Sequence, residues 1–491
     1  MDRVTTGIDG LDRILGGGWP SARMILVVGR PGTGKTTIGF QFLLEGRKRG
    51  ERCLYVTLSE TAAELEAVAR CHGWDLDGVD IFELDAAKTV LGLGDAQTMF
   101  EPSDVEFRAT SQAINEAIER VAPDRVVFDS LSELSFLARD ALAFRRELLM
   151  LKQSLMTRGT AALLLSDGTA PDADRHLHSL VHGVMELEEL SPEYGPERRR
   201  LRVRKLRGVA YRGGVHDFRI VEGGVVVYPR LVAADQGQSV LGAPLESGVE
   251  ALDELLGGGL TRGTSTLFMG PAGSGKSSMV GLFAHSAALA NEPSALFMFD
   301  EEKETFLRRT EALGAPLRPY VDEGLVRLHQ IDPAQLSPGE FIHMVREEVD
   351  AGARFISIDS LNGYVFAMPN ERYLTLQLHE LLSYLAKKGV VTALVLAQSG
   401  LVGPMTSPAD VTYIADAVLI FRFFEAHGEI RRALSMMRRR SGHHGKQIRE
   451  LAFTDRIRVG ESLRGFRGIL TGTPDFVGEH QELFERADDG D

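Results

Sequence analysis

The stretches GRPGTGKT (residues 29–36) and GPAGSGKS (residues 270–277) are two versions of one pattern. Each follows a short apolar run, ILVV at 25–28 or LFM at 267–269, and each precedes a segment of helical character. This order of strand, glycine-rich loop and helix is that of a phosphate-binding loop. Its glycines let backbone amides curl around phosphate oxygens at a helix N-terminus, where the helix dipole favours anions. The sequence therefore predicts two binding sites for a nucleoside triphosphate.

The individual residues of the two loops have separate expected roles. Lys35 and Lys276 would reach the β- and γ-phosphates, while the hydroxyls of Thr36 and Ser277 would ligate Mg²⁺. An accidental glycine-rich turn is the alternative, but two copies in register make it a poor one. The expected nucleotide contacts are Gly29, Gly32, Thr33, Gly34, Lys35, Thr36, Thr37, Gly270, Gly273, Ser274, Gly275, Lys276, Ser277 and Ser278.

The similarity of the two halves extends well beyond the loops. Residues 7–36 and 248–277 align without a gap at an offset of 241, with 12 of 30 positions identical. A repeat of this period indicates two whole domains rather than a solenoid, and 491 residues are enough for two. We expect a first domain over 1–232, a linker over 233–244, a second domain over 245–475 and a mobile tail over 476–491.

Each half repeats a series of apolar runs separated by helix-period segments. Continuous β-branched and aliphatic runs of this kind predict strands buried on both faces. The fold class is therefore α/β, with a mostly parallel central sheet covered by helices on both sides. Each half then becomes β-rich, at 198–229 in the first copy and at 418–442 in the second.

Carboxylates follow two of the expected strands in each half. Asp129 after RVVF and Asp359 after FISI are the candidates for holding Mg²⁺ beside Thr36 and Ser277, because the loop motif needs an acid at the end of a neighbouring strand. A strand that merely ends in aspartate is the alternative.

A second position in each half could supply the base that orients an attacking group. Glu60 is the candidate in the first copy, and Asp300 and Glu301 are the candidates in the second. A solvated helix cap is the alternative reading of these acids.

Both β-rich segments carry clusters of basic residues. Alternate residues of a strand share a face, so Lys205 and Arg207 are expected to point the same way, as are Arg438 and Arg440. Such a pair suits the phosphates of a nucleotide bound by a neighbouring subunit. A solvated strand face paired with acids and a nucleic-acid groove are the two alternatives.

Composition narrows the class of protein. The formal net charge of −14 disfavours broad capture of nucleic acid, and no apolar stretch is long enough for a membrane span. The N-terminus lacks the apolar segment of a signal peptide. Cys53 and Cys71 are too few for a disulfide framework, so the cytoplasm is the expected compartment.

Taken together, these motifs resemble those of the KaiC-like circadian-clock ATPases of the RecA superfamily. The shared features are TTGIDGLDRILGGG, YVTLSET, FDS and KLRG in the first half, and SGVEALDELLGGG, FDEE, IDS and ILTGTP in the second. The resemblance implies a homo-hexameric double ring with ATP at subunit interfaces, a first tier that hydrolyses ATP slowly and a second tier that phosphorylates its own serine and threonine residues. It also implies an acceptor at Thr412, with Thr406 and Ser407 as nearby alternatives, and it leaves regulatory protein partners open.

The chain departs from the family pattern at several of these positions. The family's glutamate pairs read Ser59-Glu60 and Asp300-Glu301, its second Lys-Met-Arg-Gly element reads RRRS at 438–441, and Tyr413 replaces an acceptor threonine. Kinase activity is therefore less firmly implied than ATP binding. A DNA-dependent recombination ATPase and a nucleotide-dependent scaffold without phosphotransfer are the competing functions.

Overall fold

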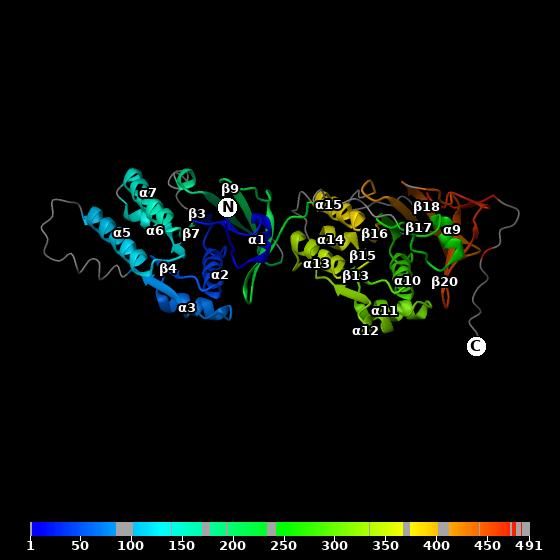
Figure 1. The fold of residues 1–491 in the computed structure, drawn as a ribbon. Coiled ribbons are helices and arrows are strands. Elements are labelled where there is room, and N and C mark those ends of the chain that lie inside the picture. The colour runs from blue at the N-terminus through cyan, green and yellow to red at the C-terminus, as the bar shows by residue number, and fades with distance from the viewer. Residues whose placement is uncertain are drawn as a thin grey trace. The chain divides into compact units, whose positions relative to one another are not determined.

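The computed structural model describes residues 2–84, 102–138, 140–168, 177–192, 195–232, 242–332, 334–366, 374–400, 412–440, 442–471, 474–477 and 483. The chain divides into two compact units, Met1–Arg230 and Leu231–Asp491, called here the first and second domains (Figure 1). Most of the expected linker and of the expected C-terminal tail lie outside the described residues.

The first domain is built around one nine-stranded sheet in the order β11-β10-β9-β8-β3-β7-β6-β4-β5. Its parallel part runs from β8 to β5, and β9, β10 and β11 extend it as antiparallel strands. The elements are β1 Arg3–Val4, α1 Asp9–Leu15, β2 Trp19–Pro20, β3 Met24–Val28, α2 Lys35–Lys48, β4 Cys53–Thr57, α3 Ala62–Cys71, β5 Val79–Glu83, α5 Pro102–Val121, β6 Arg125–Asp129, α6 Leu131–Leu137, α7 Ala141–Arg158, β7 Ala161–Ser166, β8 Gly183–Leu190, β9 Arg198–Leu206, β10 His216–Val221 and β11 Gly224–Tyr228.

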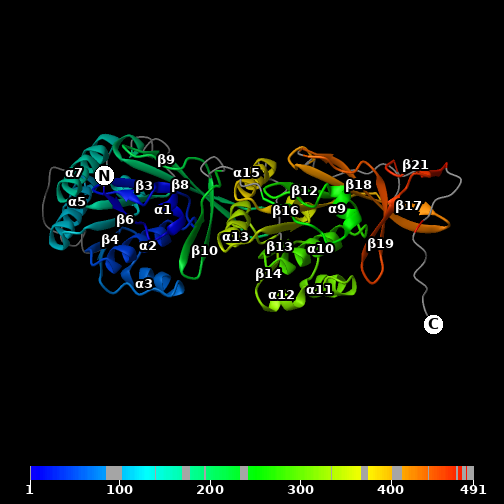
Figure 2. The ribbon, with the colours of Figure 1, turned by 45° about the vertical axis from the view of Figure 1, so that its right-hand side comes forward.

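The second domain repeats this sheet strand for strand, in the order β14-β13-β15-β16-β12-β17-β18-β19-β20. Figure 2 shows the long strands β17 and β18: β17 pairs parallel with β12, and β18 begins the antiparallel part of the sheet. The elements are α9 Glu250–Leu256, β12 Ser265–Pro271, α10 Lys276–Leu289, β13 Ser294–Met298, α11 Lys303–Ala312, α12 Arg318–Asp322, β14 Val326–Gln330, α13 Pro338–Asp350, β15 Phe355–Asp359, α14 Leu361–Phe366, α15 Leu374–Lys387, β16 Val391–Gln398, β17 Ala417–Ala426, β18 Glu429–Arg439, β19 Ile448–Phe453, β20 Ile457–Ser462, β21 Phe466–Arg467 and β22 Asp475–Phe476.

Alternate residues of the central strands enter different cores. In β3, Ile25 and Val27 pack with α1, α2 and α3, whereas Met24 and Leu26 pack with α5, α6 and α7. Figure 1 shows these two sets of helices on opposite sides of the sheet. The second domain has the same two layers, with α9, α10 and α11 on one face and α13, α14 and α15 on the other. Burial on both faces explains why the strands read as continuous apolar runs.

The duplication persists in small backbone features. The register shifts at Val184/Met185 between β8 and β9, and at the equivalent Val418/Leu419 between β17 and β18. The expected α/β fold with two tandem P-loop domains is thus confirmed. No helix within the described ranges combines the length and apolar character that a membrane crossing requires.

Candidate nucleotide-binding sites

The two glycine loops have backbone shapes that only glycine allows easily. Gly34 and Gly275 precede α2 and α10 in the left-handed region, with φ of 91° and 104°. A Cβ at Gly34 would lie 2.7 Å from the Ile220 side chain, and one at Gly275 would lie 2.1 Å from the Phe453 ring. Each loop therefore needs glycine for conformation and for packing against the β-rich part of its own domain.

The conserved spacing also produces matching side-chain contacts in both loops. Thr33 Oγ1 donates to Arg30 O at 2.7 Å, and Ser274 Oγ donates to Pro271 O at 2.8 Å. Both hydroxyl side chains are almost fully buried, so they brace the loop from inside. Residues expected to contact the nucleotide thus divide into those that shape the loop and those that remain at its surface.

The two loop lysines are buried but have different partners. Lys35 Nζ donates to Gly29 O at 2.7 Å and forms an ion pair with Asp167 Oδ1 at 2.8 Å. Lys276 Nζ donates to Pro271 O at 2.6 Å, and burial lowers the pKa of this lysine to about 8. By strand register the position equivalent to Asp167 is Ala397, near the end of β16. The first lysine is therefore paired with an acid, whereas the equivalent position of the second domain is an alanine.

The loop hydroxyl and the strand-end aspartate meet in each domain. Thr36 Oγ1 donates to Asp129 Oδ2 at 2.8 Å, and the Tyr55 hydroxyl donates to the same oxygen at 2.5 Å. In the second domain, burial raises the pKa of Asp359 to about 6, while a hydrogen bond from Ser277 acts in the opposite direction. In both domains, the structure thus places the loop hydroxyl within hydrogen-bond distance of the strand-end aspartate.

The candidate bases lie at the same end of each sheet. Glu60 is exposed, yet partial desolvation and then the nearby Asp129 charge raise its pKa. In the second domain, Asp300 accepts a 2.5 Å hydrogen bond from Ser360, and Glu301 pairs with Arg309 at 2.5 Å. The first domain has Val68 at the position equivalent to Arg309, so Glu60 has no ion-pair partner at that position.

The paired cations contact backbone carbonyls just before equivalent strands, β8 and β17, in the two domains. Lys205 Nζ donates to His178 O at 2.5 Å and to Val181 O at 2.8 Å, and Arg207 donates to Ser179 O at 3.0 Å. These carbonyls precede β8, which runs parallel to β3, whereas the glycine loop follows β3. The side chains of Lys205 and Arg207 are thus directed toward the end of the parallel strands that lies opposite the glycine loop of their own domain.

Arg438 and Arg440 repeat this arrangement around the proposed acceptor. Arg438 donates to Thr412 O at 3.4 Å, and Arg440 donates to Tyr413 O at 2.5 Å. Arg440 also pairs with Asp416 at 3.2 Å. Thr412 lies half-buried in the turn before β17, while Thr406 and Ser407 lie outside the described residues.

Several other basic residues of the two clusters have structural partners instead. Ion pairs join Arg199 to Glu189, Arg200 to Asp217, Arg204 to Glu186 and Arg431 to Glu450. For these four residues the alternative of a strand face paired with acids holds.

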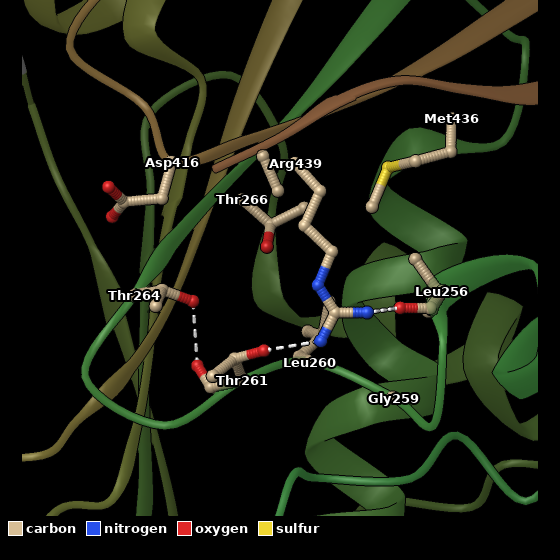
Figure 3. A pocket seen from close by; sticks show the side chains of 10 residues that line it. Leu256, Gly259, Leu260, Thr261, Thr264, Thr266, Asp416, Met436 and Arg439 are labelled. Atoms are coloured by element: carbon tan, nitrogen blue, oxygen red, sulfur yellow. Dashed lines mark hydrogen bonds between the residues drawn. The ribbon is translucent and has the colours of Figure 1, made fainter. Parts of the chain in front are cut away.

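Arg439, between the two candidate cations of the second domain, has a different structural task. Figure 3 shows it reaching the end of α9, where it donates to Leu256 O and, at 2.7 Å, to Thr261 Oγ1. Carbonyls at a helix C-terminus attract cations, so Arg439 caps α9.

Three residues near the loops were missed by sequence reasoning: Tyr55, Asp167 and Arg309. Asp167 could have been noticed, because the apolar run at 161–166 also ends in an acid. Tyr55 and Arg309 gave no local signal, since their partners lie on other elements.

Comparisons with known proteins give the same family in both halves. The family model described as the KaiC ATPase matches residues 4–232 and 245–462. The chain is 27% identical over 487 residues to the circadian clock oscillator protein KaiC of Parathermosynechococcus lividus, covering 96% of this chain and 88% of that one. It is 28% identical over 485 residues to the protein of the same name from Synechococcus elongatus, covering 96% and 92%. It is also 26% identical over 500 residues to the circadian clock protein KaiC3 of Synechocystis sp., covering 98% and 96%. The chain belongs to the KaiC ATPase family, with one copy of the ATPase domain in each half.

Proposed function

We propose that each domain binds ATP with Mg²⁺ and hydrolyses it, and that the second domain also phosphorylates Thr412, so that the protein acts as a timing or signalling switch. The observation that carries this proposal is the repeated cradle. In both halves a glycine loop, a buried lysine and a hydroxyl bonded to a strand-end aspartate occur together.

The residues present fit a triphosphate and its metal ion. Thr36 with Asp129, and Ser277 with Asp359, offer the oxygen ligands that Mg²⁺ prefers. Lys35 and Lys276 would contact the β- and γ-phosphates. When bound, Mg²⁺ neutralises charge on the phosphates that develops during transfer.

For hydrolysis, we assign the orientation of the attacking water to Glu60 in the first domain. Its raised pKa makes this carboxylate a better proton acceptor than an ordinary glutamate. In the second domain Asp300 and Glu301 are both candidates. Water would form the new bond to the γ-phosphorus, the bond to the β,γ-bridging oxygen would break, and the water proton would pass to the carboxylate.

We propose that Lys205, Arg207, Arg438 and Arg440 contact ATP held by a neighbouring subunit of a homo-hexamer. Support comes from the orientation of Lys205 and Arg207, which are directed away from their own glycine loop. A site completed by a second copy would make ATP turnover depend on assembly.

Thr412 is the proposed acceptor because it combines a hydroxyl with a position beside Arg438. Its oxygen would bond to the γ-phosphorus of ATP on the neighbouring subunit, ADP would leave with the bridging oxygen, and the proton would pass to Asp300 or Glu301. The new phosphate would bring about −1.5 to −2 charges to the turn contacted by Arg438 and Arg440. That charge would change the contact between subunits and so provide the switch.

The test is incubation of the full chain with γ-labelled ATP and Mg²⁺, followed by mapping of the label by mass spectrometry. We expect label on Thr412 that is lost in T412A and K276A but retained in K35A. T471A is the matched control, because Thr471 is another surface threonine of the second domain. Label that persists in T412A would contradict Thr412 as the acceptor, and no label at all would contradict the kinase assignment while leaving ATP hydrolysis standing.

A further inference from the structure

The proposed Mg²⁺-binding aspartates of the two domains, Asp129 and Asp359, differ in the residues that hydrogen-bond to them. Tyr55 is fully buried in β4, and its ring packs on Phe40 with centroids 5.2 Å apart. Its hydroxyl donates to Asp129 Oδ2 at 2.5 Å. The second domain has Leu296 at the equivalent strand position. Of these two equivalent residues, only Tyr55 can donate a hydrogen bond to the aspartate of its domain.

Strand register places Tyr55 at this carboxylate. Tyr55 pairs with Val127 of β6, two residues before Asp129, and Leu296 pairs with Ser357 of β15, two residues before Asp359. The phenol thus reaches along β6 from beneath the aspartate, while Thr36 donates to the same Oδ2 from the glycine loop at 2.8 Å. Two donors on one oxygen fix the rotation of the carboxyl group, and neither of them bonds Oδ1.

A hydrogen bond of this kind has a cost if it is lost. A buried phenol without an acceptor carries a desolvation penalty, and hydrogen bonds to charged groups are among the stronger ones in proteins. Groups that orient metal ligands from behind commonly contribute about 10- to 100-fold to metal affinity or activity. Tyr55 has the position and the chemistry of such a group.

We propose that Tyr55 is a positioning residue for Mg²⁺ in the first domain, and that the lack of an equivalent hydroxyl at Leu296 gives the two domains different magnesium requirements for nucleotide binding. The inference rests on the proposed binding of Mg²⁺ and ATP by both cradles. It adds a residue that neither the loop motif nor the strand-end aspartate includes.

The test compares full-length K276A with the double variant Y55F/K276A, so that only the first domain retains its loop lysine. Binding of a fluorescent ATP analogue is measured in EDTA and over a series of Mg²⁺ concentrations. We expect Y55F to leave binding in EDTA unchanged and to raise the Mg²⁺ concentration for half-maximal enhancement by about tenfold. Displacement of EPR-visible Mn²⁺ provides a second reading of metal affinity that does not depend on turnover.

Y228F in the same background is the matched control, since it removes another buried tyrosine hydroxyl of the first domain. Its magnesium curve should coincide with that of K276A. Coincident curves for Y55F and K276A would overturn the role of Tyr55. A parent K276A chain that binds the analogue without any response to Mg²⁺ would overturn the proposed function of the first domain, and the inference with it.

Discussion

At the level of single residues, the two loop lysines show how the same motif is tuned differently by its surroundings. Lys35 is held by the Asp167 carboxylate, whereas Lys276 is held by a backbone carbonyl and has its pKa lowered to about 8 by burial. An incoming phosphate must compete with Asp167 for Lys35. It meets no such acid at the equivalent Ala397.

This contrast leads to a prediction for D167N. Removing the carboxylate frees Lys35 and eliminates repulsion of the phosphates, so ATP should bind the first domain up to about tenfold more tightly, or about 1.4 kcal/mol. Equilibrium binding in a K276A background measures this effect. D167E, which retains the charge, should stay close to the parent. Weaker binding in D167N would show that Asp167 supports the nucleotide instead of competing with it.

Two histidines, half-buried His182 and buried His216, give the first domain an expected sensitivity to acid. Burial, followed by nearby Lys152, Arg23, Arg207 and Lys205, lowers the pKa of His182 to about 4. Its Nδ1 accepts a hydrogen bond from Met24 N at 3.2 Å, which requires that nitrogen to be unprotonated. Burial likewise lowers the pKa of His216 to about 4. Protons therefore bind the unfolded chain, with a histidine pKa near 6.5, before they bind the folded domain.

The free energy of unfolding of the first domain should thus be unaffected by these histidines above pH 6.5 and fall between pH 6.5 and 4. The slope should be about 1 kcal/mol per pH unit per histidine, reduced from the full linkage value because His182 is only half-buried. Trp19 and Trp74, the two tryptophans of the chain, both lie in this domain, so their fluorescence in urea titrations reports it selectively. H182N retains an acceptor for Met24 N and should lessen the slope. An unchanged slope in H182N would mean that other groups cause the acid sensitivity.

At the level of elements, much of the fold could be predicted because the relevant signals are local. Apolar runs marked the four central parallel strands of each domain, β3, β7, β6 and β4 in the first, but not the edge strands β5 and β14, and the glycine patterns marked the start of α2 and α10. Asp129 and Asp359 could also be predicted from the sequence, since the carboxyl ends of parallel strands lie at the same end of a sheet. Tyr55 was not, because its contact depends on the register between β4 and β6. Arg439 was not separable from Arg438 and Arg440 until α9 was placed beside β18.

The capping of α9 by Arg439 is itself testable. R439M removes the donors to Leu256 O and Thr261 Oγ1, so the second domain should lose about 1–3 kcal/mol of unfolding free energy. Calorimetric unfolding measures this loss. R438M is the matched control, because the one bond of Arg438 to the described part of its own chain is that to Thr412 O at 3.4 Å, so its loss should change stability little. Equal destabilisation by both variants would contradict the division between a capping residue and a residue that acts across subunits.

At the level of the whole molecule, each chain is proposed to have two ATP sites, and each site is completed by cations of a neighbouring subunit. Lys205 and Arg207 contact backbone carbonyls just before β8, so they lie at one end of the parallel strands. The glycine loop follows β3 and lies at the other end of these strands. In a ring of identical subunits, every interface can bring the cations of one subunit to the glycine loop of the next. An isolated subunit would then hold ATP without completing the site.

Mixing two inactive variants tests this arrangement. In a K276A background, K35A removes the loop lysine and K205A/R207A removes the cations, so each alone should lose ATP turnover by the first domain. When the two are dissociated, mixed equally and reassembled, random assembly should restore about a quarter of the interfaces, and activity in that proportion. A mixture as inactive as its components would place the cations and the loop lysine in the same subunit's site.

The most direct test of the account is the number of nucleotides bound per chain. Equilibrium binding with Mg²⁺ and a slowly hydrolysed ATP analogue should give two per chain in the unaltered protein and one in either K35A or K276A. Protein unfolded in urea serves as the blank, and thermal unfolding confirms that each variant is folded. One nucleotide per unaltered chain, or two in either variant, would contradict the claim that both halves hold ATP through the same cradle.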